Sequence, residues 1–281
     1  MTPYQRPATG DEHGGGGRWV AGFVLALVLA AAFSALMLYL ITSEGAAREA
    51  HRRIVDALAE GDALFVPERH DDFLLRAEAS EPGEALRYPD WPVQVTVTRE
   101  EALASTPESL RTLLLDRSAT ALYAEGTGVL RDPEATGEPG RFSAAGIVDS
   151  FMDVLREDMH GAAFIAMIVL FLLAAVVGGV VGMLTRGYGR VIAIGIAALA
   201  GALPVLAVSA MLHAYMRVSG DTDTEYLRLR LLDVGEELSA VTVTAAAAIT
   251  VASGAVVVLG MVCARWADSR TTGHGLERRT A

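Results

Sequence analysis

The sequence contains a single cysteine and no lysine or asparagine, so its basic residues other than histidine are all arginine. One cysteine, Cys263, excludes an intramolecular disulfide and any zinc or iron–sulfur site built from several thiolates. The absence of asparagine excludes N-glycosylation. Charged residues make up 20% of the 281 residues and aromatic residues 6%, whereas 52% are hydrophobic. This composition is typical of a membrane protein rather than a soluble domain.

The chain is acidic, with a formal net charge of −11 at pH 7. A protein of this net charge is repelled by the phosphates of nucleic acid and of an anionic lipid surface, so we expect no nucleic-acid partner and no anionic lipid surface as the main partner of its bulk.

Four long apolar runs contain no Asp, Glu, Arg or Lys. They cover residues 19–41, 162–184, 191–213 and 241–263. Because roughly 20 apolar residues cross the hydrocarbon core of a bilayer as a helix, the sequence predicts four transmembrane helices.

Arginines near the ends of these runs predict their orientation, because short cytoplasmic loops are enriched in basic residues. Both termini and the turn between the second and third helices carry such arginines. The predicted segments are a cytoplasmic, disordered N-terminus (1–18), transmembrane helix 1 (19–41), an extracytoplasmic domain (42–161), helix 2 (162–184), a cytoplasmic turn (185–190), helix 3 (191–213), an extracytoplasmic loop (214–240), helix 4 (241–263) and a cytoplasmic tail (264–281). The alternative, a cleaved signal peptide at the first run, is disfavoured by the length of that run.

The extracytoplasmic domain is long enough to form its own core. Residues 46–60 have apolar residues at helical spacing and are predicted to continue the first span as a helix. Thr106 and Pro107 are a typical helix start, and Gly126 is placed to end that helix. Another helix is predicted to run from Ser143 into the second span, after a loop.

Apolar and polar residues alternate from Val93 to Thr98, which predicts a β-strand in the same domain. A lone strand is not stable and needs a partner. The candidate partners are residues 63–66, residues 73–75 and the alternating run 227–231, although a short helix over 224–238 fits that run as well. The predicted fold is a mainly α membrane protein, with four transmembrane helices and a mixed α+β extracytoplasmic domain between helices 1 and 2.

Two polar clusters contain residue types that bind cations. The first, Glu68 to Asp72, includes a histidine and is a candidate cation or proton-sensing site. Successive residues of an extended segment point to alternate sides, so we expect a solvated loop there. The second, residues 221–225, is similar to the start of an EF-hand. Tyr226 and Leu232 stand where that motif requires glycine and glutamate, so we predict no metal site.

His160 and His213 end the second and third spans at the same predicted depth. Such a pair could ligate a metal or pass protons. Polar residues also belong in the headgroup layer, and no further histidine lies at this level. We therefore expect no shared histidine site.

Small residues in the spans predict close helix packing. Gly178 and Gly182 have the GxxxG spacing, and they pack either within the monomer or between copies in a homo-oligomer. Pro204 predicts a kink in the third span. Trp91, which precedes the predicted strand, is expected to fill the core of the outer domain.

No motif for catalysis is present in the sequence. There is no glycine-rich nucleotide loop after a strand and no nucleophilic serine elbow. The spans also lack the carboxylate pairs that mark ion pathways. We therefore predict a non-enzymatic protein without catalytic, cofactor-binding or metal-binding residues and without a cofactor.

The order of the segments is similar to that of permease-like subunits of ABC systems of the cell-division and macrolide-exporter type, and to that of claudin-like four-helix proteins. The turn Thr185–Arg190 is shorter than the coupling segment of the first group. The outer segments lack the cysteines of the second group. The resemblance therefore concerns topology.

The predicted outer segments concentrate the negative charge. Residues 42–161 carry 12 arginines and 24 acidic residues, and residues 214–240 carry 3 and 6. The leading hypothesis is a multi-pass protein of a prokaryotic cell membrane whose acidic extracytoplasmic domain mediates protein interaction or assembly in the cell envelope. Its partners would be the lipid bilayer and another membrane or envelope protein. The alternatives are a transport or channel component and a sensor of an extracellular ligand or ion.

Overall fold

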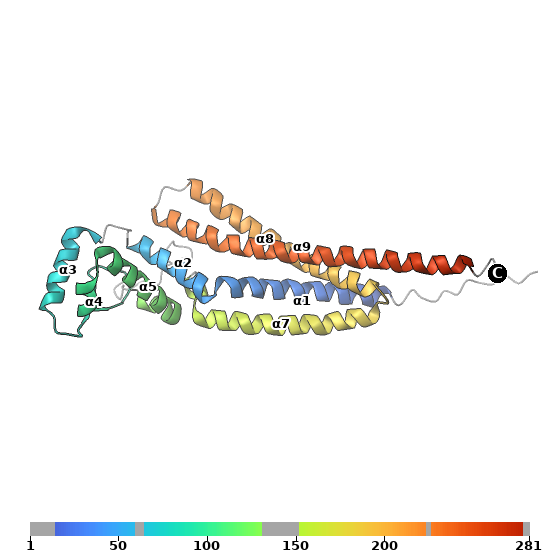
Figure 1. Cartoon of the computed structure of the whole chain (residues 1–281), viewed down its shortest axis with the longest axis horizontal. Coiled ribbons are helices and arrows are strands. Elements are labelled where there is room, and N and C mark those ends of the chain that lie inside the picture. The colour runs from blue at the N-terminus through green and yellow to red at the C-terminus, as the bar shows by residue number, and fades with distance from the viewer. Residues whose placement is uncertain (1–14, 60–64, 131–151, 223–225, 278–281) are drawn as a thin grey trace, which may run out of the picture. The chain divides into compact units, whose positions relative to one another are not determined.

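The computed structural model of the chain describes residues 15–59, 65–130, 152–222 and 226–277 (Figure 1). Most of them are helical. In chain order the elements are α1 (Gly15–Ile41), α2 (Glu44–Leu58), α3 (Pro67–Ala79), β1 (Ala85–Leu86), β2 (Val97–Thr98), α4 (Arg99–Ala104), α5 (Pro107–Glu125), the 3-10 helix η2 (Gly126–Val129), α7 (Glu157–Leu184), α8 (Gly189–Thr222) and α9 (Tyr226–Glu277).

The chain divides into two compact units. The first, called here the spanning unit, comprises Met1–Met37, Ile165–Ser209 and Thr244–Ala281. The second, the polar unit, comprises Leu38–Phe164 and Ala210–Val243. Each unit combines segments that are far apart in the sequence, so each depends on long-range contacts.

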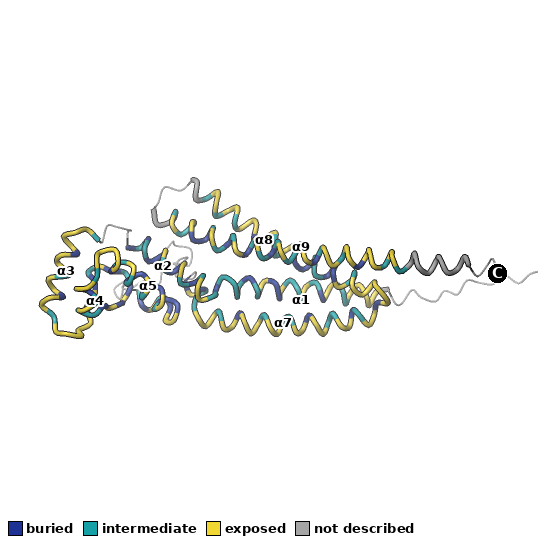
Figure 2. Tube along the Cα trace, in the orientation of Figure 1, coloured by how far each residue is buried: buried dark blue, intermediate teal, exposed yellow. Residues whose placement is uncertain are grey.

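Four helices in the described part of the chain are long and apolar enough to cross a membrane. They cover Gly16–Ile41, Glu157–Leu184, Gly189–Ser219 and Leu229–Ala267, and they contain the four predicted runs. Many residues along them are exposed (Figure 2). Large apolar residues are among them, as expected where lipid rather than water surrounds a helix. These helices support a mainly helical, multi-pass membrane protein.

Helices of the spanning unit approach each other closely at glycines. A Cβ atom on Gly201 of α8 would lie 2.8 Å from the backbone oxygen of Ala26 in α1. Cβ atoms on Gly195 of α8 and Gly260 of α9 would each lie 2.8 Å from a side chain of the other helix. Small residues therefore let these helix backbones pack closely. Such packing matters in lipid, where the hydrophobic effect does not drive helices together.

The predicted GxxxG pair has little contact within the spanning unit. A Cβ on Gly178 would lie 4.0 Å from the Leu25 side chain, and a Cβ on Gly182 would meet no atom within 4 Å. Its role in self-association stays a prediction.

Helix α8 continues through Pro204.

The core of the polar unit lies where α2 packs on α5, with α3 packing on α4. Helix α5 begins as predicted, because the Thr106 side chain accepts a hydrogen bond from the Ser109 backbone and Pro107 follows in the first turn. Gly126 ends the helix with a φ of 72°. Trp91 is 2% exposed in this core, which confirms the place predicted for it.

The prediction of a mixed α+β domain is wrong for the described part of the polar unit. The strands there, β1 and β2, have two residues each and pair antiparallel. Val93, Val95 and Val97 are all buried, as their alternation predicts. They pack, however, in a cluster formed mainly by residues of α2, α3 and α5, so helices rather than a larger sheet cover this segment.

The segments considered as strand partners adopt other structures. Residues 73–75 lie in α3 and residues 227–231 lie in α9, while residues 63 and 64 lie outside the described ranges. Leu231 and Val234 of α9 pack against the two apolar clusters of the polar unit. The two predicted outer segments therefore form one body, joined through a helix instead of a strand.

Two helices that were predicted to be continuous are interrupted. Thr42 and Ser43 separate α1 from α2, and Ser43 is extended, with a ψ of 143°. Leu155 and Arg156 interrupt the helix before α7, and residues 143–151 lie outside the described ranges. Neither break contains proline or glycine, so the sequence pattern carries no sign of it.

Helical structure reaches further toward both termini than predicted. Helix α1 begins at Gly15, inside the segment predicted to be disordered, and α9 continues to Glu277 in the predicted tail. Residues 1–14, the predicted loop 131–141 and residues 278–281 lie outside the described ranges.

Candidate interaction surface

The polar cluster at residues 68–72 forms part of helix α3, so the expected solvated loop is wrong. Pro67 occupies the first turn of the helix, where its missing N–H group costs no hydrogen bond. His70, Phe73 and Ala77 follow at helical spacing and are buried on one face. Burial of this face against the core of the polar unit holds the helix in place.

The opposite face of α3 is exposed and acidic. A helix turns by about 100° per residue, which places four carboxylates in one arc around Leu75. All of these side chains are exposed, and Leu75 is 63% exposed. We call this surface the acidic α3 face, and its residues are Glu68, Asp71, Asp72, Leu75 and Glu78.

The carboxylates of the acidic α3 face form no ion pair with another residue of the described chain. The ion pair of this helix joins Arg69, on its flank, to Asp90 at 3.7 Å. The face therefore presents carboxylates that have no ion-pair partner among the described residues, around an exposed apolar side chain.

Charges on α2 and α5 are instead compensated within the polar unit. Arg53 of α2 contacts Glu49 in the same helix at 2.8 Å and also contacts Glu237 of α9. Arg111 of α5 contacts Asp56 of α2 at 2.6 Å. These pairs join α2 to α5 and α9, so they serve the internal structure of the unit.

A hollow of about 540 Å³ lies beside these ion pairs, between α2 and α5. Its charged lining consists of three arginines and three carboxylates, namely Arg52, Arg53, Arg111, Glu49, Asp56 and Glu108. All three arginines are already in ion pairs. The hollow therefore has no net charge with which to select an ion.

The structure does not bring the predicted cation-binding residue types together. In the cluster 68–72, His70 is buried, whereas Asp71 and Asp72 are exposed on the far face of the helix. Residues 223–225 of the EF-hand-like run lie outside the described ranges. Within those ranges, no group of three or more His, Cys, Asp or Glu residues is placed to hold a metal ion.

His160 and His213 have separate partners in the polar unit. The His160 ring stacks on Tyr39, with 4.6 Å between ring centroids, and its Nδ1 lies 3.3 Å from Thr42 Oγ1. Nδ1 of His213 lies 2.9 Å from Ser239 Oγ. The two histidines therefore contact different residues and do not share a partner in these contacts.

His51 of α2 is fully buried, and neither ring nitrogen lies within ordinary hydrogen-bond geometry of another described residue. Burial disfavours the charged form and lowers the pKa of His51 from 6.5 to about 4, against an opposing effect of the Met152 backbone. The ring is therefore neutral at pH 7. Ala47 and Ile54, at helical spacing from His51, are the sequence signal that places it inside.

No protein family, curated protein or solved structure matches this chain. Its function therefore has to be argued from its own residues.

The sequence shows the acidic stretch but not the surface that it belongs to. An extended segment at residues 68–72 would divide its carboxylates between two sides. Phe73 and Ala77 have the spacing of a buried helix face, and this is the signal that predicts a helix instead. That helix adds Leu75 and Glu78 to the acidic face.

Proposed function

We propose that this protein is a non-enzymatic integral membrane protein whose acidic extracytoplasmic domain binds a basic segment of another protein in the cell envelope. The acidic α3 face supports the proposal, because its carboxylates lack ion-pair partners within the described chain and surround Leu75. A basic partner would be attracted by this charge. Burial of Leu75 in the contact would add roughly 1.5–3 kcal/mol.

The proposed location is the membrane of a prokaryotic cell, with both termini in the cytoplasm and the polar unit outside. The positions of the arginines along the chain support this orientation. Arg18, Arg186, Arg190 and Arg265 flank the spans on the side of the termini, as the positive-inside rule requires of cytoplasmic ends.

The test is affinity purification of the full-length protein from its native membrane in a gentle detergent. The centre of the acidic α3 face is neutralised in a variant that combines Asp71→Asn, Asp72→Asn and Leu75→Ser, which leaves Glu68 and Glu78 in place. We expect a protein with a basic surface to co-purify with the wild type and to be lost from this variant. Exposed substitutions change stability by less than about 0.5 kcal/mol, so both chains should melt alike.

A matched control changes another exposed leucine and another exposed carboxylate of the polar unit. Leu103→Ser with Glu108→Gln alters α4 and α5 and leaves α3 intact. This control should retain the partner. Recovery of the wild-type chain alone, or equal recovery of the partner with the α3 variant, would contradict the proposal.

The two other hypotheses predict different measurements. A transport or channel component would change ion or solute flux when the purified protein is reconstituted into liposomes. A sensor would gain thermal stability from a small ligand or an ion, because a ligand that binds the folded state shifts the unfolding equilibrium.

A further inference from the structure

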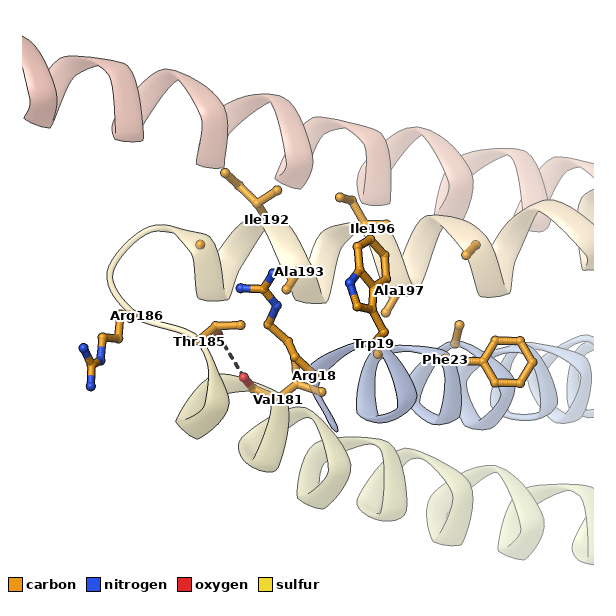
Figure 3. Close-up of a pocket in the computed structure, with 14 residues that line it drawn as sticks. Arg18, Trp19, Phe23, Val181, Thr185, Arg186, Ile192, Ala193, Ile196 and Ala197 are labelled. Carbon is orange, nitrogen blue, oxygen red and sulfur yellow. Dashed lines mark hydrogen bonds between the residues drawn. The ribbon is translucent and has the colours of Figure 1, made fainter. Parts of the chain in front are cut away.

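The spanning unit contains a hollow of about 460 Å³ at the end where α7 turns into α8 (Figure 3). Small residues of α1 and α8 leave this space, among them Gly22, Ala26, Ala193 and Ala197. The aromatic side chains of Trp19 and Phe23 lie along it. The volume lies within the range of about 300–1,000 Å³ that is typical of small-ligand sites.

Among the described residues, two charged side chains line this hollow, and both are arginines: Arg18 of α1 and Arg186 between α7 and α8. In Figure 3, Arg18 reaches from α1 toward α8, whereas Arg186 points away from the hollow. Neither forms an ion pair with another described residue. Arg190, close by, donates from Nε to the backbone oxygen of Thr185 at 2.8 Å. One end of an apolar hollow therefore carries positive charge that no carboxylate of the described residues pairs with.

We propose that this hollow binds one anionic phospholipid, with an acyl chain against the apolar lining and the phosphate at Arg18. The Thr185 hydroxyl already donates to the Val181 backbone oxygen at 2.8 Å, so it is engaged within its own helix. A lining of this kind suits hydrocarbon, and a free guanidinium pairs with phosphate oxygens. Trp19 is 75% exposed beside Arg18, as expected of an aromatic ring at the headgroup layer.

Charge decides which lipid fits best. A zwitterionic headgroup carries its own cation next to the phosphate, and that cation offsets the attraction of Arg18. An anionic headgroup has no such cation. Each arginine near a membrane surface contributes about 1 kcal/mol of attraction to anionic lipid, which corresponds to about a fivefold difference in affinity.

Native mass spectrometry of the full chain in detergent tests the headgroup contact. The protein is titrated with phosphatidylglycerol or phosphatidylcholine that carry the same acyl chains. We expect one phosphatidylglycerol to bind about fivefold more tightly than phosphatidylcholine. Arg18→Gln should abolish this preference, whereas Arg265→Gln should retain it, because Arg265 is exposed on α9 and does not line the hollow. Equal binding of the two lipids to the wild type would overturn the proposal.

A steric variant tests the acyl-chain contact. Gly22 lines the hollow, and a Cβ there would meet no atom within 4 Å, so Gly22→Leu introduces a side chain at an open position of the lining, and leucine favours the helix over glycine. We expect this variant to lose the bound lipid. Gly179→Leu on α7 adds the same side chain at an equally open position outside the hollow and should retain it. Lipid retained by Gly22→Leu, or lost from both variants, would overturn the assignment.

Discussion

The indole Nε1–H of Trp91 donates a hydrogen bond of 2.9 Å to the hydroxyl of Ser118, and both residues are buried. The contact ties the turn that precedes the buried valine segment to the middle of α5. Because a buried indole N–H needs an acceptor, this one hydroxyl lets a large aromatic side chain fill the core of the polar unit.

Ser118→Ala should lower the free energy of unfolding of the polar unit by about 1–3 kcal/mol, because the indole N–H is then buried without an acceptor. Denaturant unfolding of the full chain in detergent, followed by tryptophan fluorescence, measures the change. Thr120→Ala on the same helix is the control. The hydroxyl of Thr120 is exposed and, among the described residues, donates to the Asp116 backbone oxygen, so its loss should have little effect. Equal stability of the two variants would contradict the role of the hydroxyl.

His51 should make the stability of the polar unit depend on pH between about 4 and 6.5. In this window the unfolded chain binds a proton that the buried ring does not, so the free energy of unfolding falls as the pH falls. The total loss from this group is about 3 kcal/mol. His51→Leu keeps an apolar side chain and removes the titration, and melting curves at pH 7 and at about pH 4 should differ less than in the wild type. An unchanged pH dependence in this variant would exclude His51 as its source.

Gly126 should not tolerate a side chain. Its φ of 72° and ψ of −158° belong to a region that only glycine enters readily, and a Cβ there would lie 2.9 Å from Arg156 Cδ. We expect Gly126→Ala to lower the free energy of unfolding by about 1–3 kcal/mol. Gly128→Ala, two residues on, adds a Cβ that meets no atom within 4 Å and serves as the control in the same unfolding experiment.

Glu101 should stabilise the start of α4 through two separate contacts. Its carboxylate accepts from the Thr98 backbone N–H at 2.8 Å and from Arg117 at 2.5 Å. Glu101→Ala removes both contacts and should cost about 1–2 kcal/mol. Glu101→Gln keeps the cap and should cost less, because an amide can still accept from Thr98.

The contribution of Glu101 should also depend on pH. The hydrogen bond from Arg117, followed by that from the Thr98 backbone, lowers the pKa of Glu101. Its stabilising effect is therefore complete above the ordinary pKa of glutamate and is lost as the pH falls through the lowered value. The stability difference between the wild type and Glu101→Gln should shrink as the pH falls below the ordinary pKa of glutamate. A difference independent of pH would contradict the ion pair with Arg117.

Several features of the fold could be predicted because their signals lie in consecutive residues. Hydropathy alone locates the four spans, since about 20 apolar residues in a row satisfy their own backbone only as a helix. Thr106 and Pro107 predict the start of α5 through local capping chemistry. The alternation from Val93 to Val97 predicts which side chains are buried.

The sequence by itself therefore determined that the chain has four apolar helices and where its charge lies. Tertiary structure decided the rest of the polar unit. Helices cover the valine segment, and Leu231 of α9 packs against that same core. Leu75 is exposed among carboxylates that have no ion-pair partner in the described part of the chain. A short alternating run takes its structure from whatever covers its apolar face, and that partner lies far away in the sequence.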